Sequence, residues 1–443
     1  MSSVLRNVLK NTFAQVGAKV GSILASIVLT IILTRALGKG DFGVYTFIVS
    51  LTLLFGTVAD WGTNIITVRE ASKDPKSSGS LFANATVARL LLSLLAVFLL
   101  NLVVQIVPGW KEFAKPTAVA SLVLLALSFK TSAGMVFHSF QKLERAAFVD
   151  FLASAIFVLF VYLGLRLGSS LEMVFWMWFL ATLLSALLAV LIARNLFDFR
   201  KTLKLVDADS LTQFFKTRFF KDALPAGFLF IVSTIYSRVD ILILEHFKGA
   251  EAVASYGLAY KVYDQVILAS AFLMASLFPI LARSFSEKNE KLKEYYQRGF
   301  DTLLIFGAAG SVLLIVLSPL IISLLGGGQY GESVVVLRLL SLAVLPSFIN
   351  HLTGYSLLAF GKQKLSLLIA VTALVLNTSL NLILVPYYSY YGAALITIGT
   401  EFFVLAISTF VIARSTGLLP SLTSFPSTLL QGKEIYSSLK EKE

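Results

Sequence analysis

Long apolar segments, most of them about 20 residues or more, follow one another along almost the whole chain. A helix needs about 20 apolar residues to cross the hydrocarbon core of a bilayer. Only helices and closed barrels satisfy their backbone hydrogen bonds in lipid, and these segments are too long for barrel strands. The sequence therefore predicts an all-α membrane protein with about 12 transmembrane helices. The predicted spans are 13–37, 42–64, 81–107, 116–138, 147–167, 171–194, 221–246, 252–281, 299–325, 333–359, 365–386 and 391–413.

The composition agrees with this fold class, since 57% of the residues are hydrophobic and only 14% are charged. In a soluble domain, roughly a quarter of the residues are charged. The net charge of +12 comes from Lys and Arg in short connections between the apolar segments. A protein that binds nucleic acid would concentrate these residues in a basic soluble domain. We therefore predict a multi-pass protein of the cell membrane without a nucleic-acid partner.

The positive charges are distributed unequally between the two sets of connections, which predicts the orientation in the membrane. Both termini are predicted to be cytoplasmic, because the connections on their side of the membrane carry most of the Lys and Arg. The cytoplasmic set is Arg69, Lys73, Lys76, Lys142, Arg145, Arg200, Lys201, Lys204, Lys216, Arg218, Arg283, Lys288, Lys291, Lys293, Arg298, Lys362 and Lys364. The opposite set is Arg35, Lys39, Lys111, Lys115, Arg166 and Lys248.

The longest connection lies at the middle of the chain and divides six spans from six. It interleaves Phe and Leu with Lys and Arg, which favours an amphipathic helix on the cytoplasmic leaflet over a solvated linker. The predicted parts are an N-terminal six-helix lobe (1–194), this cytoplasmic linker (195–220), a C-terminal six-helix lobe (221–414) and a cytoplasmic tail (415–443).

Two sets of residues recur in the second half of the chain, which indicates an internal repeat. Because six spans separate the copies, each pair keeps the same side of the membrane, and the two lobes are predicted to be parallel repeats. The first set, Gly38/Gly249 and Tyr45/Tyr256, lies at the connections 1–2 and 7–8. The second set, Gly134/Gly354, Phe140/Phe360 and Lys142/Lys362, lies at the connections 4–5 and 10–11.

Signatures of enzymes and of metal centres are absent from the sequence. The chain has no cysteine and three scattered histidines, so no disulfide, thiolate or metal site is expected. It also lacks the Walker, G-x-S-x-G and H-E-x-x-H motifs. We therefore predict a protein that is not an enzyme and binds no cofactor, and whose energy for transport would come from a gradient or the membrane potential.

Charged residues within the predicted spans are the strongest candidates for functional sites. Each is costly in hydrocarbon, so it has a partner or lines a hydrated cavity. Arg238–Asp240 and Lys261–Asp264 are close enough along the chain for structural ion pairs, while Lys130 and Glu245 lie near span ends, from which they reach the interface. A cavity lined by cations instead suits a phosphate-bearing ligand. The candidates for this cationic, substrate-binding cavity are Lys19, Arg89, Arg238, Lys261 and Arg338; those for ion coupling or gating are Asp60, Asp240, Asp264 and Glu401.

An ordered set of segments resembles the polysaccharide flippases of bacteria and archaea, the oligosaccharide-lipid branch of the multidrug/oligosaccharidyl-lipid/polysaccharide (MOP) superfamily. The resemblance runs over nearly the whole chain. It is carried by "LTRALGKGDFGVYTF", "DWGTNIITVREASKD", "SRVDILIL", "VASYGLAYKVYD", "LFPILAR", "GGGQYGESVVVLRLLSLAVLP", "LLAFGKQK" and "LNLILVPYYSYYGAALITIGTE".

The resemblance implies two lobes that form a V and open alternately to each side. It implies that an oligosaccharide linked to polyprenyl phosphate or pyrophosphate moves from the cytoplasmic to the outer leaflet. Implied partners are membrane lipids, a coupling cation (H+ or Na+), and glycosyltransferases or a polymerase of the same pathway. Family members use cavity cations in spans 1 and 8, here Lys19 and Lys261. The resemblance also implies an outer gate where the lobes close at Gly38, Gly40, Tyr45, Gly249 and Tyr256.

Other functions remain open on the sequence alone. A cation-coupled multidrug antiporter of the MATE type would need acids in the N-terminal lobe, where Asp60 is the lone candidate. A lipid II flippase would have more spans. A polysaccharide polymerase would carry a large outer loop, which is absent here. The remaining alternative is a membrane scaffold without transport activity.

Overall fold

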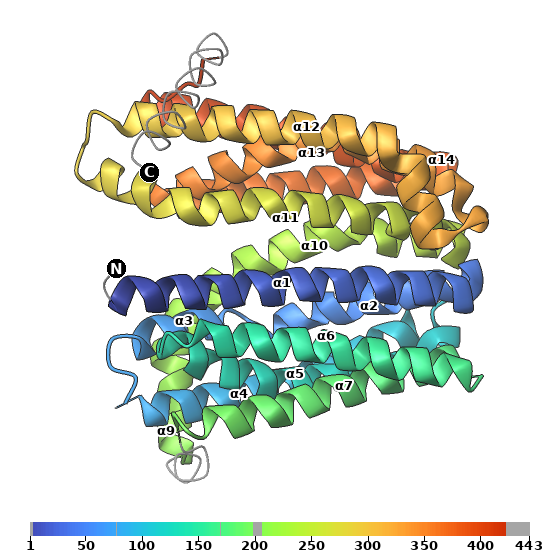
Figure 1. Cartoon of the computed structure of the whole chain (residues 1–443), viewed down its shortest axis with the longest axis horizontal. Coiled ribbons are helices and arrows are strands. Elements are labelled where there is room, and N and C mark those ends of the chain that lie inside the picture. Colours follow the sequence, from blue (N-terminus) through green and yellow to red (C-terminus); the bar gives the residue numbers. More distant parts are fainter. Residues whose placement is uncertain (1–2, 77, 169, 198–205, 422–443) are drawn as a thin grey trace. The chain divides into compact units, whose positions relative to one another are not determined.

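The computed structural model describes residues 3–76, 78–168, 170–197 and 206–421, without the side chains of 3–14, 16, 222, 225 and 226. This part of the chain is helical and contains no strand (Figure 1). Eleven of its helices are long and apolar enough to cross a membrane, with limits close to the predicted spans. The prediction of an all-α, multi-pass membrane protein is thereby confirmed.

The last of these helices, α14 (Gln363–Thr416), contains two predicted spans in one element of 54 residues. A straight helix of this length would measure about 80 Å, more than twice the thickness of the hydrocarbon core. The backbone leaves helical geometry at Ser389 (φ 51°, ψ −140°), three residues after Pro386, so α14 is two helices joined at a kink. The kink explains why eleven helices carry the twelve predicted spans.

The chain divides into two compact units, and the first is Met1–Ala254 together with Leu324–Gln329. In this unit α5 packs against α2, α4 and α7, while α1 packs along α6 (Figure 1). Its helices are α1 (Ser3–Ala36), α2 (Gly38–Asp60), α3 (Thr63–Ala71), α4 (Gly79–Ile106), α5 (Ala114–Ser139), α6 (Leu143–Arg166), α7 (Leu171–Ala193), α9 (Ala208–Phe214) and α10 (Leu224–Lys248), with short turns of 3-10 helix at Lys111–Phe113 and π-helix at Phe215–Ala223.

Small residues and buried hydroxyl groups explain why α5 occupies the centre of this unit. Small side chains let helices approach closely in lipid, where no hydrophobic force joins them. Ala120 and Ala133 on α5 are fully buried. Two polar contacts then connect α5 to α4: Ser128 with Ser93, and Asn101 donating to Ser121 at 3.1 Å.

The break between α2 and α3 ends the second span at Asp60, four residues before its predicted limit. Trp61 (φ 39°) and Gly62 (φ 77°) have left-handed backbone conformations. The Asp60 carboxylate then accepts hydrogen bonds from the Asn64 amide (3.3 Å) and the Thr63 hydroxyl (3.4 Å) at the start of α3. The charged residues that follow therefore lie on a separate short helix.

The predicted linker packs onto the first unit. Residues 198–205 lie outside the described chain, and the rest begins with a capping box between Asp207 and Ser210. Phe214 and Phe219 belong to the same buried cluster as Phe82. The apolar face of this part of the linker is therefore covered by protein. That the linker lies on the cytoplasmic leaflet stays a prediction.

Glu70 on α3 connects the linker to the cytoplasmic end predicted for this unit. It accepts hydrogen bonds from Lys73 (2.8 Å) and Arg69 (3.0 Å), and Arg218 of the π-helical turn lies 3.6 Å away. Chiefly through the bond from Lys73, these cations hold the pKa of the Glu70 carboxyl below its usual value.

The second unit is Ser255–Ser323 together with Tyr330–Glu443, of which the described chain reaches residue 421. Its helices are most of α11 (Ala250–Ser286) and α12 (Leu292–Gly326), then α13 (Gly331–Ala359) and α14. Hydroxyl groups connect α13 to its neighbours. Ser333 donates to the Ser255 carbonyl (2.8 Å) on α11, and Ser408 on α14 donates to Thr353 (2.8 Å).

The backbone repeats its local geometry at the positions that recur in the sequence. Gly38 and Gly249 both have positive φ, at 75° and 76°. The turn after α5 has its positive φ at Gln141 (55°), and the turn after α13 has it at Gly361 (71°). The amides of Lys142 and Lys362 then bond to the carbonyl five residues earlier, at 2.7 and 2.8 Å. The two sets of sequence matches thus mark two pairs of similar turns.

Candidate functional site

The α1–α2 and α10–α11 junctions, the two predicted outer tips, lie against each other in the first unit. A Cβ atom on Gly43 would lie 1.8 Å from the Ala250 carbonyl oxygen and 2.5 Å from its carbon. Real Cβ contacts essentially never fall below 3.0 Å. Glycine at position 43 is therefore required for this backbone approach.

A third segment, 324–329, joins the same contact. The Thr34 hydroxyl donates to the Leu325 carbonyl, and Gln329 Nε2 donates to the Thr34 carbonyl at 3.0 Å. Arg35 Nη2 donates to the Leu324 carbonyl at 3.2 Å. The end of α1 is thus held by three hydrogen bonds to the end of α12 and the 3-10 turn that follows it.

The residues predicted for the outer gate have different surroundings. Gly38 and Gly249 form the turns, and no atom lies within 4 Å of a Cβ built on Gly40. Tyr45 is buried and stacks on Phe175, with ring centroids 5.8 Å apart. In the second unit, Tyr256 is buried and its hydroxyl lies 3.2 Å from that of Thr397. The gating role of these five residues stays a prediction.

The opposite end of α2 also approaches α10 through glycine. A Cβ on Gly62 would lie 2.7 Å from the Ala223 carbonyl oxygen, and one on Gly227 would lie 2.6 Å from the backbone of Trp61. Both ends of α2 therefore lie against the ends of α10 or the residues that flank it.

Arg89 and Asp60 form a buried ion pair in the first unit. The Arg89 side chain is 4% exposed, and its Nη1 donates to Asp60 Oδ1 and to the Thr63 hydroxyl (3.2 Å). The pair joins α4, which carries Arg89, to the α2–α3 break, which follows Asp60. Of the two interpretations open for Arg89, this geometry favours structural pairing.

The other candidate charges lie on several helices of the two units. Lys19 on α1 is exposed, and Asp240 on α10 is buried, whereas Arg238, Lys261 and Asp264 are half-buried. Arg338 on α13 is exposed and donates from Nε to the Ser318 hydroxyl of α12 at 3.1 Å. Their predicted roles in substrate binding and ion coupling stay predictions.

Glu401 lies within a polar network in the second unit. Its Oε2 accepts hydrogen bonds from the Ser347 hydroxyl (2.8 Å) and from Asn350 Nδ2 (2.9 Å). The Tyr263 hydroxyl lies 2.8 Å from Ser347, which extends the network from α14 through α13 to α11. Donors of this kind hold a carboxylate in place within a helical bundle.

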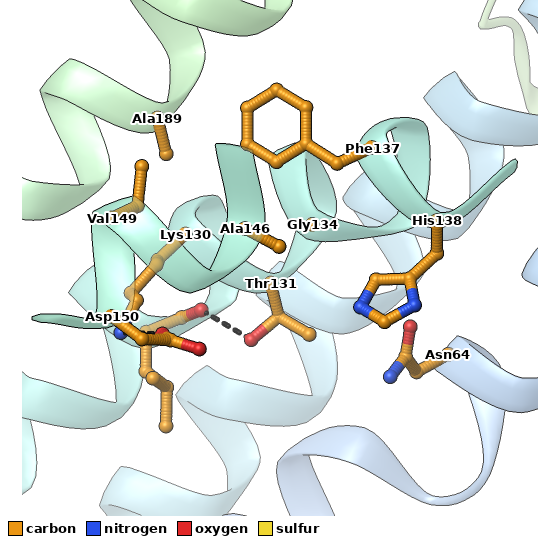
Figure 2. Close-up of a pocket in the computed structure, with 11 residues that line it drawn as sticks. Asn64, Lys130, Thr131, Gly134, Phe137, His138, Ala146, Val149, Asp150 and Ala189 are labelled. Atoms are coloured by element: carbon orange, nitrogen blue, oxygen red, sulfur yellow. Dashed lines mark hydrogen bonds and ion pairs between the residues drawn. The ribbon is translucent and has the colours of Figure 1, made fainter. Parts of the chain in front are cut away.

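A cavity of about 190 Å³ lies among α3, α5, α6 and α7 of the first unit (Figure 2). Lys130 and Asp150 form an ion pair of 2.6 Å at its edge. Within the described residues, no cluster of three or more His, Cys, Asp or Glu side chains could hold a metal ion. The cavity is lined by Asn64, Leu127, Lys130, Thr131, Gly134, Phe137, His138, Ala146, Val149, Asp150 and Ala189.

A family model described as "Polysaccharide biosynthesis protein" matches residues 8–285, which is more than half of the chain. The chain belongs to the polysaccharide biosynthesis protein family. A second model, described as MatE, matches residues 225–383. The suspected family resemblance is thereby confirmed.

Two curated relatives and one solved structure support this membership in the polysaccharide biosynthesis protein family. The chain is 26% identical over 187 residues to the capsular polysaccharide biosynthesis protein CapF of Staphylococcus aureus, covering 42% of the chain and 47% of CapF. It is 27% identical over 179 residues to the probable low-salt glycan biosynthesis flippase Agl15 of Haloferax volcanii, covering 38% and 36%. Each match thus spans less than half of the relative.

The solved structure of the lipid II flippase MurJ in an inward closed conformation has a similar fold. The TM-score is 0.74 at 15% identity, and the similarity covers 97% of this chain and 93% of MurJ. The fold of this polysaccharide biosynthesis family member is therefore that of MOP transporters.

Several residues of these sites were not predicted from the sequence. Gly43 lies in the same glycine-rich tip as the predicted Gly38 and Gly40. The sequence pattern does not indicate which of these three glycines makes the close backbone contact. Ser347 and Asn350 have the i, i+3 spacing that places both on one helix face, and this spacing was a usable signal. The cavity near Lys130 had no local signal, since its lining comes from four helices.

Proposed function

We propose that this protein is a flippase that moves a lipid-linked oligosaccharide from the cytoplasmic to the outer leaflet by alternating access. The observation that carries the proposal is the family match over residues 8–285, together with the relative named as a glycan biosynthesis flippase. The lipid is a polyprenyl phosphate or pyrophosphate, and the intramembrane cations are its phosphate-binding groups. Membrane lipids and the glycosyltransferases or polymerase of the pathway are its further partners.

The contact between Gly43 and Ala250 supports alternating access. In the proposed cycle, this contact between two helix junctions is closed in one state and separates in another. With both termini cytoplasmic, as predicted, this contact is the proposed outer gate between the two six-helix lobes.

The competing multidrug antiporter is disfavoured by the Arg89–Asp60 pair. Organic cations need a carboxylate that is available to them, and Asp60 is already neutralised by Arg89. Glu401 in the second unit is our candidate for ion coupling, because hydrogen bonds from Ser347 and Asn350 hold its carboxylate within the helical bundle. We propose H+ or Na+ as the coupling ion.

The decisive experiment measures translocation in proteoliposomes that contain only this protein. We expect lipid-linked oligosaccharide to reach the outer leaflet when a membrane potential or a cation gradient is imposed, and no change on addition of ATP. The glycan exposed outside is measured by its accessibility to a lectin or a glycosidase. Translocation stimulated by ATP in this purified system would contradict the proposed energy source.

Alanine variants of the remaining cations test the phosphate-binding role. We expect Lys19→Ala, Arg238→Ala, Lys261→Ala and Arg338→Ala to insert and fold as the wild type does, with several of them losing glycan export. The measurement is complementation of a strain that lacks its own flippase. Lys291→Ala, at an exposed position between α11 and α12, is the control. Full complementation by all four variants would exclude a cationic cavity.

A further inference from the structure

The cavity of Figure 2 has no role in the candidate sites described so far. Its walls are α5 and α6, and Asn64 of α3 and Ala189 of α7 complete it. The turn between α5 and α6 lies at the cytoplasmic side in the predicted orientation, which is the side where a substrate would enter. Gly134 contributes to the space, since no atom lies within 4 Å of a Cβ built there.

The charges at the cavity balance. Lys130 Nζ lies 2.6 Å from Asp150 Oδ1, and the two side chains are 18% and 62% exposed. A phosphate in this cavity would meet the Asp150 carboxylate, and an organic cation would meet the Lys130 ammonium. A neutral ligand that both donates and accepts hydrogen bonds suits such a pair better than either ion.

Asn64 and Thr131 indicate which groups such a ligand needs. The Asn64 Oδ1 atom is buried and has no hydrogen-bond partner within the described part of the chain. An unpartnered buried acceptor costs free energy, so a ligand that donates to it gains affinity. The Thr131 hydroxyl gives its proton to the Leu127 carbonyl at 2.8 Å, which leaves the oxygen as a second acceptor. A fully deprotonated phosphate has no proton to donate to either.

We propose that this cavity binds one neutral sugar ring of the glycan, a subsite that rests on the proposed flippase function. Sugar hydroxyls donate to Asn64 and Asp150 and accept from Lys130. Phe137 and Ala146 contribute apolar atoms to the lining, and His138 lies next to Asn64 at the polar side (Figure 2). About 190 Å³ is well below the roughly 300–1,000 Å³ of pockets for drug-sized ligands, so one ring fits and a chain of sugars does not.

Protection of a single cysteine measures this binding on the full-length protein. The chain has no native cysteine, so Ala146→Cys places one thiol in the cavity, and Ala147→Cys places the matched control on the adjacent residue, outside the lining. The probes are methyl glycosides of neutral hexoses and N-acetylhexosamines, with inorganic pyrophosphate and tetramethylammonium as charged comparisons. We expect at least one methyl glycoside to slow maleimide labelling at position 146 and not at position 147.

A second variant separates binding from folding. Asn64→Leu removes the unpartnered acceptor, and the loss of one hydrogen bond to the sugar should raise the half-protecting concentration about tenfold. The labelling rate without sugar and the melting temperature should stay close to those of the parent. Each of three results overturns the proposal. The first is that a glycoside protects the cysteine equally well with and without Asn64→Leu. The others are that only pyrophosphate or tetramethylammonium protects it, or that no glycoside does.

The translocation assay keeps the two proposals apart. If lipid-linked oligosaccharide is translocated while no glycoside protects position 146, the sugar subsite is wrong and the flippase stands. If a glycoside protects the cysteine at position 146 while no lipid-linked oligosaccharide is translocated, the sugar subsite is supported and the proposed flippase function is wrong. Protection by the lipid-linked oligosaccharide at lower concentration than by the methyl glycoside identifies the glycan of the substrate, and not a free sugar, as the occupant.

Discussion

Replacement of Gly43 with alanine is expected to abolish glycan translocation. The new Cβ would lie 1.8 Å from the Ala250 carbonyl oxygen and 3.1 Å from its Cα, and all the atoms that it meets are backbone. Backbone cannot rotate away as a flexible side chain does, so the α10–α11 junction must move and the proposed outer gate cannot close. The measurement is translocation in proteoliposomes, with insertion checked by size-exclusion chromatography.

Gly40→Ala is the matched control, because no atom lies within 4 Å of its Cβ. We expect this variant to transport as the wild type does. Cysteines at Gly40 and Glu251, each close in sequence to one contact residue, report closure directly: a disulfide requires Cα atoms within about 7 Å. It should form from the outside, stop transport and be reversed by reduction. Equal transport by Gly40→Ala and Gly43→Ala would show that the contact has no part in the cycle.

Replacement of Arg89 with leucine is expected to give the largest loss of stability among the intramembrane charges. The variant leaves the Asp60 carboxylate without its cation in a site where Arg89 is 4% exposed. Breaking a fully buried pair by removal of one partner costs about 3–5 kcal/mol, and the 20% exposure of the Asp60 side chain reduces this cost. We expect a marked fall in the melting temperature of the purified protein and in its yield from membranes.

The double variant Arg89→Leu/Asp60→Asn tests whether the unpaired charge is the cause. Asparagine keeps the oxygen that accepts hydrogen bonds from Thr63 and from the Asn64 amide, but carries no charge. Since replacement of a whole buried pair by neutral groups is often nearly neutral, most of the lost stability should return. Arg89 is a substrate-binding residue, and not a structural one, if Arg89→Leu melts as the wild type does and has lost transport.

The two predictions concern two contacts with different roles in the proposed alternating-access cycle. Gly43 is required where two helix junctions meet, at the contact that opens and closes in the proposed cycle. The Arg89–Asp60 pair holds α4 to the α2–α3 break and keeps its geometry within one unit. A transporter needs both kinds of contact, since rigid bundles must move as bodies about a few places that separate.

The sequence by itself determined the helical spans and, to within several residues, their limits. Apolar length is a local property, and each helix satisfies its own backbone hydrogen bonds in lipid, so no knowledge of neighbouring segments is needed. The break at the α1–α2 tip and the recurring glycines could also be found in the sequence. A positive φ at Gly38 or Gly249 is a local property, set by the residues around it.

Only the tertiary structure decided which polar residues meet. Arg89 and Asp60 are 29 positions apart, Glu401 and Ser347 are 54 apart, and Thr34 bonds to the end of α12, 291 positions later. The helical period gives the face of each residue but not the helix that this face contacts. Gly43, and not Gly40, takes the close contact because α10 happens to end opposite it, and the cavity beside Lys130 exists because four helices leave space around a glycine. Such sites depend on packing between distant segments, which a single sequence does not encode in any local pattern.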